Sequence, residues 1–205
     1  LLAVFLSSMV FTAVAEDKKE DKKDDEKEKE TLTQILEKKD AFEGFVGIYR
    51  DKKDGSGLVV LDESQLNTPF LYFVSTVDGA VAAGTFRGQF RGSRLIEFRR
   101  NYDRIEVVSK TPRFYFDPEN AVSRAADANI SEAILHSTKI EHEDEGKIAI
   151  SLSDLFANEE LHKISPTPSD DPKAEKRRFK PGKLSKDKTS ISEIKNFPKN
   201  TQVVV

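Results

Sequence analysis

The feature that most constrains the fold of this chain is a series of short apolar runs separated by turn residues. Runs at 45–49 and 58–61 flank the glycine-bearing turn 51–57, which predicts a hairpin because glycine adopts positive φ without steric cost. Three further pairs of runs follow: 94–97 with 104–108, 138–142 with 147–152, and 190–197 with 201–205. This spacing is typical of antiparallel strands joined by short turns.

The other segments predict a few further elements around these strands. Residues 70–75 are apolar on both faces of a strand, which predicts a buried strand. Residues 113–116 could extend the sheet. Apolar residues spaced as on one helix face predict a short helix near 32–39, capped by Thr31 or Thr33, and a second helix over 121–135. We therefore expect an α+β fold, mainly antiparallel hairpins with one or two packed helices. Ser153 would cap a short turn, and residues 163–183 would form a long surface loop.

The first 31 residues predict an export signal followed by a tether. Residues 1–15 are apolar or small, end in the cleavage pattern Ala13-Val14-Ala15, and are too short to span a bilayer. Because no basic segment precedes them, we expect this signal peptide to be truncated at its start. Residues 16–31 predict a charged disordered tether, since residues 16–30 hold nine acids and six lysines (6 − 9 = −3) and nothing to bury. We expect an exported protein, periplasmic or extracellular, without a membrane span after signal cleavage.

The break at Asn67-Thr68-Pro69 divides the remaining chain. We expect a small N-terminal domain at 32–66 and a larger β-rich domain at 67–205. The last run, 201–205, would leave an apolar and unpaired edge, which folded domains avoid. We therefore expect a fragment cut at both ends, with its larger domain incomplete at the C-terminus.

Composition excludes several classes of site. The chain has no cysteine, so disulfides, thiolate metal sites and cysteine nucleophiles are absent. Its formal net charge of −3 provides no general attraction to nucleic acids or anionic membranes.

Motifs for metal binding and nucleophilic catalysis are incomplete. His142 starts a stretch that resembles the zinc-protease pattern H-E-x-x-H, but Gly146 occupies the position of the second histidine, and the stretch predicts a turn. His136 and His162 lack ligand spacing. Ser56 lies between two glycines without the strand-to-helix context of a catalytic serine. We predict no catalytic, cofactor-binding or metal-binding residue in this chain.

Two other patterns have an ordinary structural interpretation. Gly84, Gly88 and Gly92 are spaced by four but match no phosphate-binding motif, so we interpret them as part of a flexible loop. The stretch 85–104 interleaves arginines with aromatic residues, as single-strand binders do. Export and the acidic balance favour instead a strand pair with arginines on its solvent face. The glycosylation sequon at Asn129 falls in a predicted helix and is interpreted as chance.

The order of several motifs resembles a known family. They are Phe45-Val46-Gly47-Ile48-Tyr49, Asn67-Thr68-Pro69-Phe70-Leu71, Ile96-Glu97-Phe98-Arg99-Arg100, residues 148–156 (IAISLSDLF), and residues 184–191 (LSKDKTSI) through 196–200 (NFPKN). Together they resemble the N-terminal region, of unknown function, of large bacterial exported zinc-dependent metalloproteases of the metzincin-like type. The resemblance covers roughly residues 32–205.

This resemblance implies a function for the parent protein and not for a site in this chain. The parent would hydrolyse peptide bonds with a zinc-activated water, and its zinc would lie in a missing downstream domain. The present chain would be a non-catalytic accessory region whose partner is its own downstream peptidase domain, with no nucleic acid bound. The alternative is a stand-alone periplasmic binding or structural module without enzymatic activity.

Overall fold

The fold is seen in a computed structural model that describes residues 30–112, 132–164 and 188–205, together with positions 117, 119, 123, 170–171, 173, 179 and 184–185. The predicted signal peptide 1–15, most of the tether 16–31 and the predicted strand 113–116 lie outside the described residues. Most of the predicted loop 163–183 also lies outside them. In the described part of the chain, no helix is both long and apolar enough to cross a bilayer.

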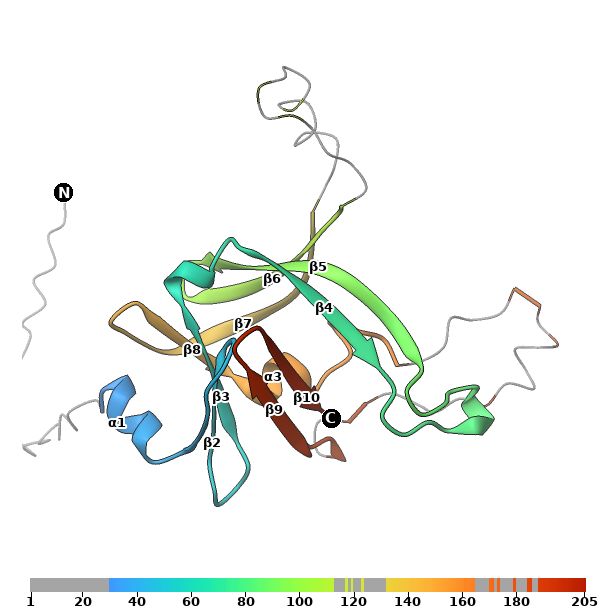
Figure 1. The fold of residues 1–205 in the computed structure, drawn as a ribbon, viewed down its shortest axis with the longest axis horizontal. Coiled ribbons are helices and arrows are strands. Elements are labelled where there is room, and N and C mark those ends of the chain that lie inside the picture. The colour runs from blue at the N-terminus through green and yellow to red at the C-terminus, as the bar shows by residue number, and fades with distance from the viewer. Residues whose placement is uncertain are drawn as a thin grey trace, which may run out of the picture.

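Eight strands form one antiparallel sheet that curls into a half-barrel (Figure 1). The spatial order is β1-β2-β3-β8-β7-β6-β5-β4, so β1 and β4 are its two edge strands. The strands are β1 (Asp40–Phe42), β2 (Gly47–Arg50), β3 (Gly57–Asp62), β4 (Pro69–Ser75), β5 (Phe90–Asn101), β6 (Arg104–Lys110), β7 (Ala133–Asp144) and β8 (Lys147–Ser151).

The predicted hairpins are confirmed. Strands β2 and β3 pair across the turn at 51–56, and β5 pairs with β6 around Tyr102 and Asp103. Strands β7 and β8 meet at Glu145 and Gly146, both of which have positive φ, as a tight two-residue hairpin turn requires. The last hairpin, β9 (Glu193–Phe197) with β10 (Asn200–Val204), forms a separate two-stranded sheet.

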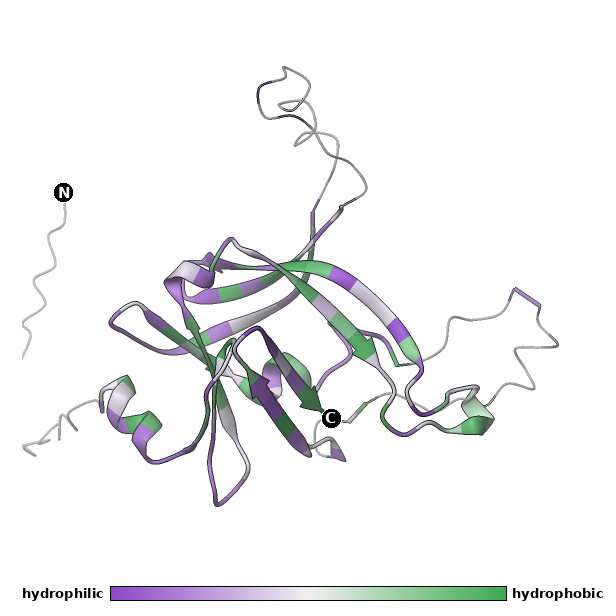
Figure 2. Cartoon of the chain, viewed as in Figure 1, coloured by the Kyte–Doolittle hydropathy of each residue, from purple (hydrophilic) through white to green (hydrophobic). Residues whose placement is uncertain are grey.

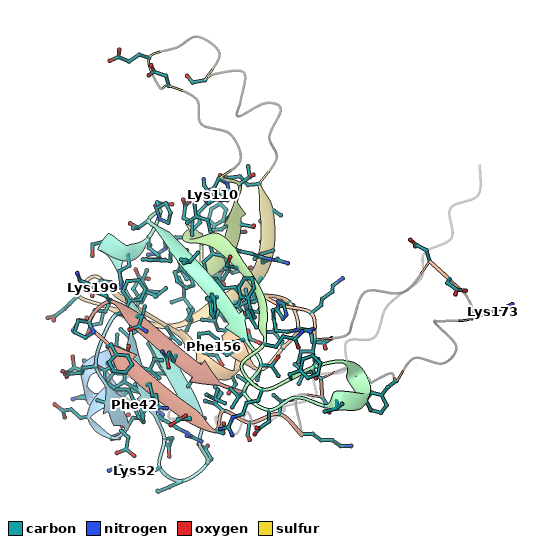
Figure 3. The ribbon with its side chains drawn as sticks, turned by 45° about the vertical axis from the view of Figure 1, so that its right-hand side comes forward. Phe42, Lys52, Lys110, Phe156, Lys173 and Lys199 are labelled. Carbon is teal, nitrogen blue, oxygen red and sulfur yellow. The ribbon has the colours of Figure 1, made fainter. Side chains whose placement is uncertain are left out.

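The core lies on the concave face of the half-barrel. Alternate side chains of the central strands point inward there, against α3 (Leu152–Phe156) and the β9–β10 hairpin. In Figure 3, Phe156 lies in the middle of the molecule, whereas Lys110 lies at the rim of the sheet. Fully buried members of this core include Ile48, Leu61, Ile105, Val107, Ile148, Ile150 and Leu152.

The β9–β10 hairpin is fixed to the β1 side of the sheet by polar contacts. The Asn196 side-chain amide donates to the carbonyls of Phe42 and Val46, each at 2.6 Å. The Phe45 N–H donates to the Phe197 carbonyl at 2.8 Å. A Cβ on Gly44 would lie 2.3 Å from Asn196 Oδ1, so only glycine permits this close approach.

Helix α1 (Leu32–Glu37) packs on the opposite, convex face against Leu58, Val60 and Ala149. Of the two predicted caps, Thr31 is the N-cap, and with Gln34 it completes a capping box. The cap predicted for the short turn that forms α3 is wrong by two residues. Ser151 rather than Ser153 accepts the hydrogen bond from the Asp154 N–H, at 3.2 Å.

The expected α+β class is wrong, because the described fold is β-rich. Its interior is filled by the strands' own side chains, the β9–β10 hairpin and one short helix, so no helical layer covers the sheet. Part of the error is local: residues 133–135, predicted as the end of a helix, belong to strand β7. The rest of the predicted helix 121–135, apart from Ser123 and Glu132, lies outside the described residues.

Candidate functional site

The candidate site lies along β4, where the half-barrel ends. Strand β4 pairs with β5 on one side and with no described strand on the other. Leu71 is 72% exposed and Phe73 is 60% exposed. The prediction that this strand is buried on both faces is therefore wrong. A run that is apolar at both odd and even positions is also compatible with an edge strand that has one face in solvent.

The inward face of β4 anchors the strand to the core. The Phe70 ring meets the Phe45 ring edge-on at a centroid distance of 4.9 Å and lies 5.8 Å from the Phe98 ring. Aromatic pairs in these arrangements add to the free energy of burial. The inward side chains therefore hold β4 against the core, while its outward side stays exposed.

The outward face of β4 and β5 carries an apolar patch that we call the outer strip, made of Leu71, Phe73 and Phe90. Figure 2 shows that apolar residues recur along β4. The Phe73 and Phe90 rings contact each other at a centroid distance of 5.1 Å, yet Phe90 is itself 56% exposed. The loop that joins the two strands adds the exposed residues Val77, Val81 and Phe86. Contiguous exposed apolar side chains of this kind are typical of contact surfaces.

The backbone of β4 also presents free hydrogen-bonding groups. The Thr76 N–H donates to Gln89 and the Thr76 carbonyl accepts from Gly88, so Thr76 faces β5. Because backbone groups alternate along a strand, Val74, Tyr72 and Phe70 face β5 as well. The N–H and C=O groups of Leu71, Phe73 and Ser75 therefore point outward from the edge. Pro69 is also at an outward-pointing position, where its lack of an N–H leaves no hydrogen bond of the sheet unmade, as is common for prolines in edge strands.

The arginines of the predicted basic stretch divide into two groups, apart from Arg104, which donates to the Ser137 hydroxyl at 2.8 Å and to the Ser137 carbonyl at 2.6 Å. In the first, Arg99 donates to Glu132 at 2.6 Å and to Glu97 at 3.2 Å, and Arg100 makes a two-pronged contact with Glu143 at 2.5 and 2.9 Å. The hydrogen bonds from Lys110 and Arg99 lower the pKa of Glu132, and the bond from Arg100 lowers the pKa of Glu143. These two arginines are neutralised within the sheet.

The second group, Arg87, Arg91 and Arg94, has no carboxylate partner in the described part of the chain, and we call it the arginine group. Arg94 lies opposite Tyr72 in the β4–β5 register and is exposed. Arg91 donates to the Ile164 carbonyl at 3.3 Å, and Arg87 lies in the exposed loop before β5. The sequence segment 71–95 contains these three arginines and one acidic residue, Asp78.

His136 lies on β7, on the concave face, and is 5% exposed. Its Nδ1 lies 2.5 Å from Glu160 Oε2, and its Nε2 lies 3.9 Å from Asp154 Oδ2. Thr138, two residues along β7, donates to Asp154 Oδ2 at 2.8 Å. The cluster links α3 and the turn after it to the sheet.

The other two histidines lie apart from this cluster. His142 belongs to strand β7, so the stretch that starts like H-E-x-x-H is not helical. His162 lies near Gly92; its own burial, followed by the positive charges of Arg91 and Arg94, lowers its pKa. Among the described residues, no group of three or more His, Asp or Glu side chains is arranged to hold a metal ion.

The remaining motif residues occupy turns or fall outside the described part. Ser56 lies in the β2–β3 turn, where its N–H donates to Asp54 Oδ1 at 2.9 Å. Gly84 and Gly88 take positive φ in the loop between β4 and β5, whereas Gly92 belongs to β5 itself. The sequon at Asn129 lies outside the described residues.

Sequence reasoning missed both the exposed edge and the histidine cluster. The run 69–75 contains no charged residue that could have marked a solvent-facing side. His136 meets Glu160 through tertiary packing across 24 positions, and no local spacing announces such a contact. The division of the arginines had no local signal, because Glu132 and Glu143 lie more than thirty positions after Arg99 and Arg100 and reach them only through the folded sheet.

Comparison with known proteins yields one match. A family model described as "Domain of unknown function (DUF5117)" matches residues 88–205, which run from the end of the β4–β5 loop to the end of β10. Among curated proteins and solved structures, none matches the chain.

Proposed function

The chain belongs to the DUF5117 family, a family of unknown function, and we propose that it is a non-catalytic N-terminal accessory region of an exported zinc-dependent metalloprotease. The ordered motifs between residues 45 and 200 support this proposal by their resemblance to the leading region of such proteases. The parent protein would hydrolyse peptide bonds, and its zinc would lie in polypeptide beyond the given sequence.

The observation that carries an accessory role is the outer strip on β4 and β5. Leu71, Phe73 and Phe90 are each more than half exposed although they sit on well-paired strands. Leaving this apolar area in water costs free energy that a packed partner would recover, at about 25 cal/mol per Å² buried. A catalytic domain of the same protein would provide such a partner.

The test asks what polypeptide carries this chain in its native cell. An antibody raised against residues 31–205 should detect a product much larger than the 23.1 kDa of the chain. The immunopurified product should cleave casein, and a zinc chelator should abolish the cleavage. A product near the chain's own mass, without chelator-sensitive proteolysis, would contradict the proposal.

That contrary result would favour the second candidate, a stand-alone binding or structural module. The open edge of β4 is the observation that favours it, since an unpaired apolar strand can bind another chain without any enzyme being present. Both candidates use the same binding surface. In the first it contacts a catalytic domain of the same protein, and in the second it binds another chain.

A further inference from the structure

The two edges of the sheet differ in how they are protected. Strand β1 has three residues, and the Phe42 carbonyl on it accepts a hydrogen bond from Asn196 of the β9–β10 hairpin. Strand β4 has seven residues, no charged side chain and no described strand beyond it. Folded proteins usually shorten, charge or cover such an edge, so β4 is an exception that calls for a partner.

We propose that β4 accepts an extended segment of another polypeptide as an additional strand of the sheet, and that this segment alternates apolar with acidic side chains. The inference holds whether or not the parent protein is a peptidase. Its basis is the combination of outward backbone groups, apolar side chains and uncompensated arginines on one strand pair.

The backbone groups provide the binding mode. The N–H and C=O groups of Leu71, Phe73 and Ser75 point outward, so an added strand can bond to β4 without disturbing its ladder with β5. Main-chain hydrogen bonds of this type give affinity to peptides that extend a sheet, whereas side chains at alternate positions give specificity.

The outer strip determines one half of the pattern. Residues of the added strand that lie opposite Leu71 and Phe73 project their side chains onto the same outward face. There they meet side chains that are 72% and 60% exposed, and apolar groups at these positions bury that area. We take the added strand to be antiparallel to β4. The residues opposite Leu71 and Phe73 then also make the hydrogen bonds to the edge, because they form the hydrogen-bonded pairs of an antiparallel ladder.

The arginine group determines the other half of the pattern. The intervening residues of the added strand point to the concave side, next to Tyr72 and within reach of the Arg94 guanidinium one strand further on. Arg91 donates to the Ile164 carbonyl at 3.3 Å, and burial, followed by the charges of Arg91 and Arg94, lowers the pKa of nearby His162. Acidic side chains complement this charge and a second copy of the chain does not, since it would bring three more arginines to the same edge.

The experiment titrates the 205-residue chain with a fluorescent heptapeptide of alternating valine and glutamate, followed by fluorescence anisotropy. Saturable binding is expected. A matched peptide with lysine in place of glutamate should bind about tenfold more weakly or worse, because it places cations beside Arg94. Equal binding of the two peptides would overturn the acidic half of the proposal.

Two methylated peptides test the strand geometry without altering the protein. N-methylation of the valines removes the N–H groups that bond to β4, and binding should fall about tenfold or more. N-methylation of the glutamates, whose N–H groups face away from β4, is the matched control and should cost little. The same loss in both peptides would show that strand addition is not the binding mode.

Protein variants complete the design. Arg94→Glu should weaken binding about fivefold or more, whereas Lys139→Glu, the same charge change at an exposed position of β7, should leave it unchanged. Light scattering under the same conditions should give a monomer. A dimer that forms through β4 and excludes the peptide would overturn the proposal in favour of a second copy.

Discussion

Phe73 on β4 and Phe90 on β5 contact each other with ring centroids 5.1 Å apart, while each ring stays more than half exposed. Two aromatic rings that pair on a solvent-facing surface organise an apolar area without hiding it from water. The contact links the edge strand to its neighbour and forms the centre of the outer strip, from which the proposed partner surface follows.

Removal of one of these rings should cost little stability. Phe73→Ser is expected to change the free energy of unfolding by about 0.5 kcal/mol or less, because the side chain is mostly in solvent in both states. The control, Phe70→Ser on the inward face, loses contacts with Phe45 and Phe98 and should cost about 3 kcal/mol or more. Urea unfolding followed by circular dichroism measures both. A large loss in Phe73→Ser would mean that the outer strip is part of the core.

The contact between His136 and Glu160 should hold the turn after α3 against the sheet. In Glu160→Ala the His136 Nδ1 loses its partner at 2.5 Å, and the unfolding free energy should fall by about 1–2 kcal/mol. The segment 157–164 should also become easier to cut in limited proteolysis. Lys163→Ala, at an exposed position in the same segment, is the control and should behave as the unaltered protein. Equal cleavage of all three proteins would contradict the anchoring role.

His162 should make the fold less stable in acid. Burial and the neighbouring Arg91 and Arg94 lower its pKa below the ordinary value of 6.5, so the unfolded chain binds a proton there more readily than the folded chain. Stability is therefore full above pH 6.5 and falls as the pH drops toward the lowered folded pKa. His162→Gln should flatten part of this fall, seen as a smaller difference in urea midpoint between neutral and mildly acidic buffer. An unchanged difference would rule out His162 as its source.

Single-stranded DNA should not bind this chain with useful affinity. Arg99 and Arg100, the adjacent arginines in the basic stretch, are occupied by Glu97, Glu132 and Glu143 and are not available for phosphates. Titration with labelled oligodeoxythymidine should show no saturable binding at physiological salt. Tight, steeply salt-dependent binding would contradict this prediction and point to the arginine group as a phosphate site.

The hairpins could be predicted from sequence because their determinants are local. The glycine turn at 51–57 and the Glu145-Gly146 turn each lie between apolar runs of strand length, and local chemistry decides such pairs. Thr31 could be proposed as a cap for the same reason, since its partner Gln34 is three residues away.

The fold class and the site could not be predicted, because both depend on contacts distant in sequence. Whether residues 133–135 continue a helix or begin β7 is decided by pairing with β6, more than twenty positions earlier. Whether β4 is central or at an edge depends on a neighbouring strand, and the all-apolar run 69–75 is compatible with either. The separation of paired from unpaired arginines likewise appears only when Glu132 and Glu143 are brought beside β5.

Amide hydrogen exchange along β4, measured by NMR on the chain with and without the valine–glutamate peptide, tests the open edge most directly. In the free chain the amides of Phe70, Tyr72 and Val74 should exchange slowly and those of Leu71, Phe73 and Ser75 quickly. On addition of the peptide, the three fast amides should become protected. Protection of all six in the free chain, or no change with peptide, would contradict the account.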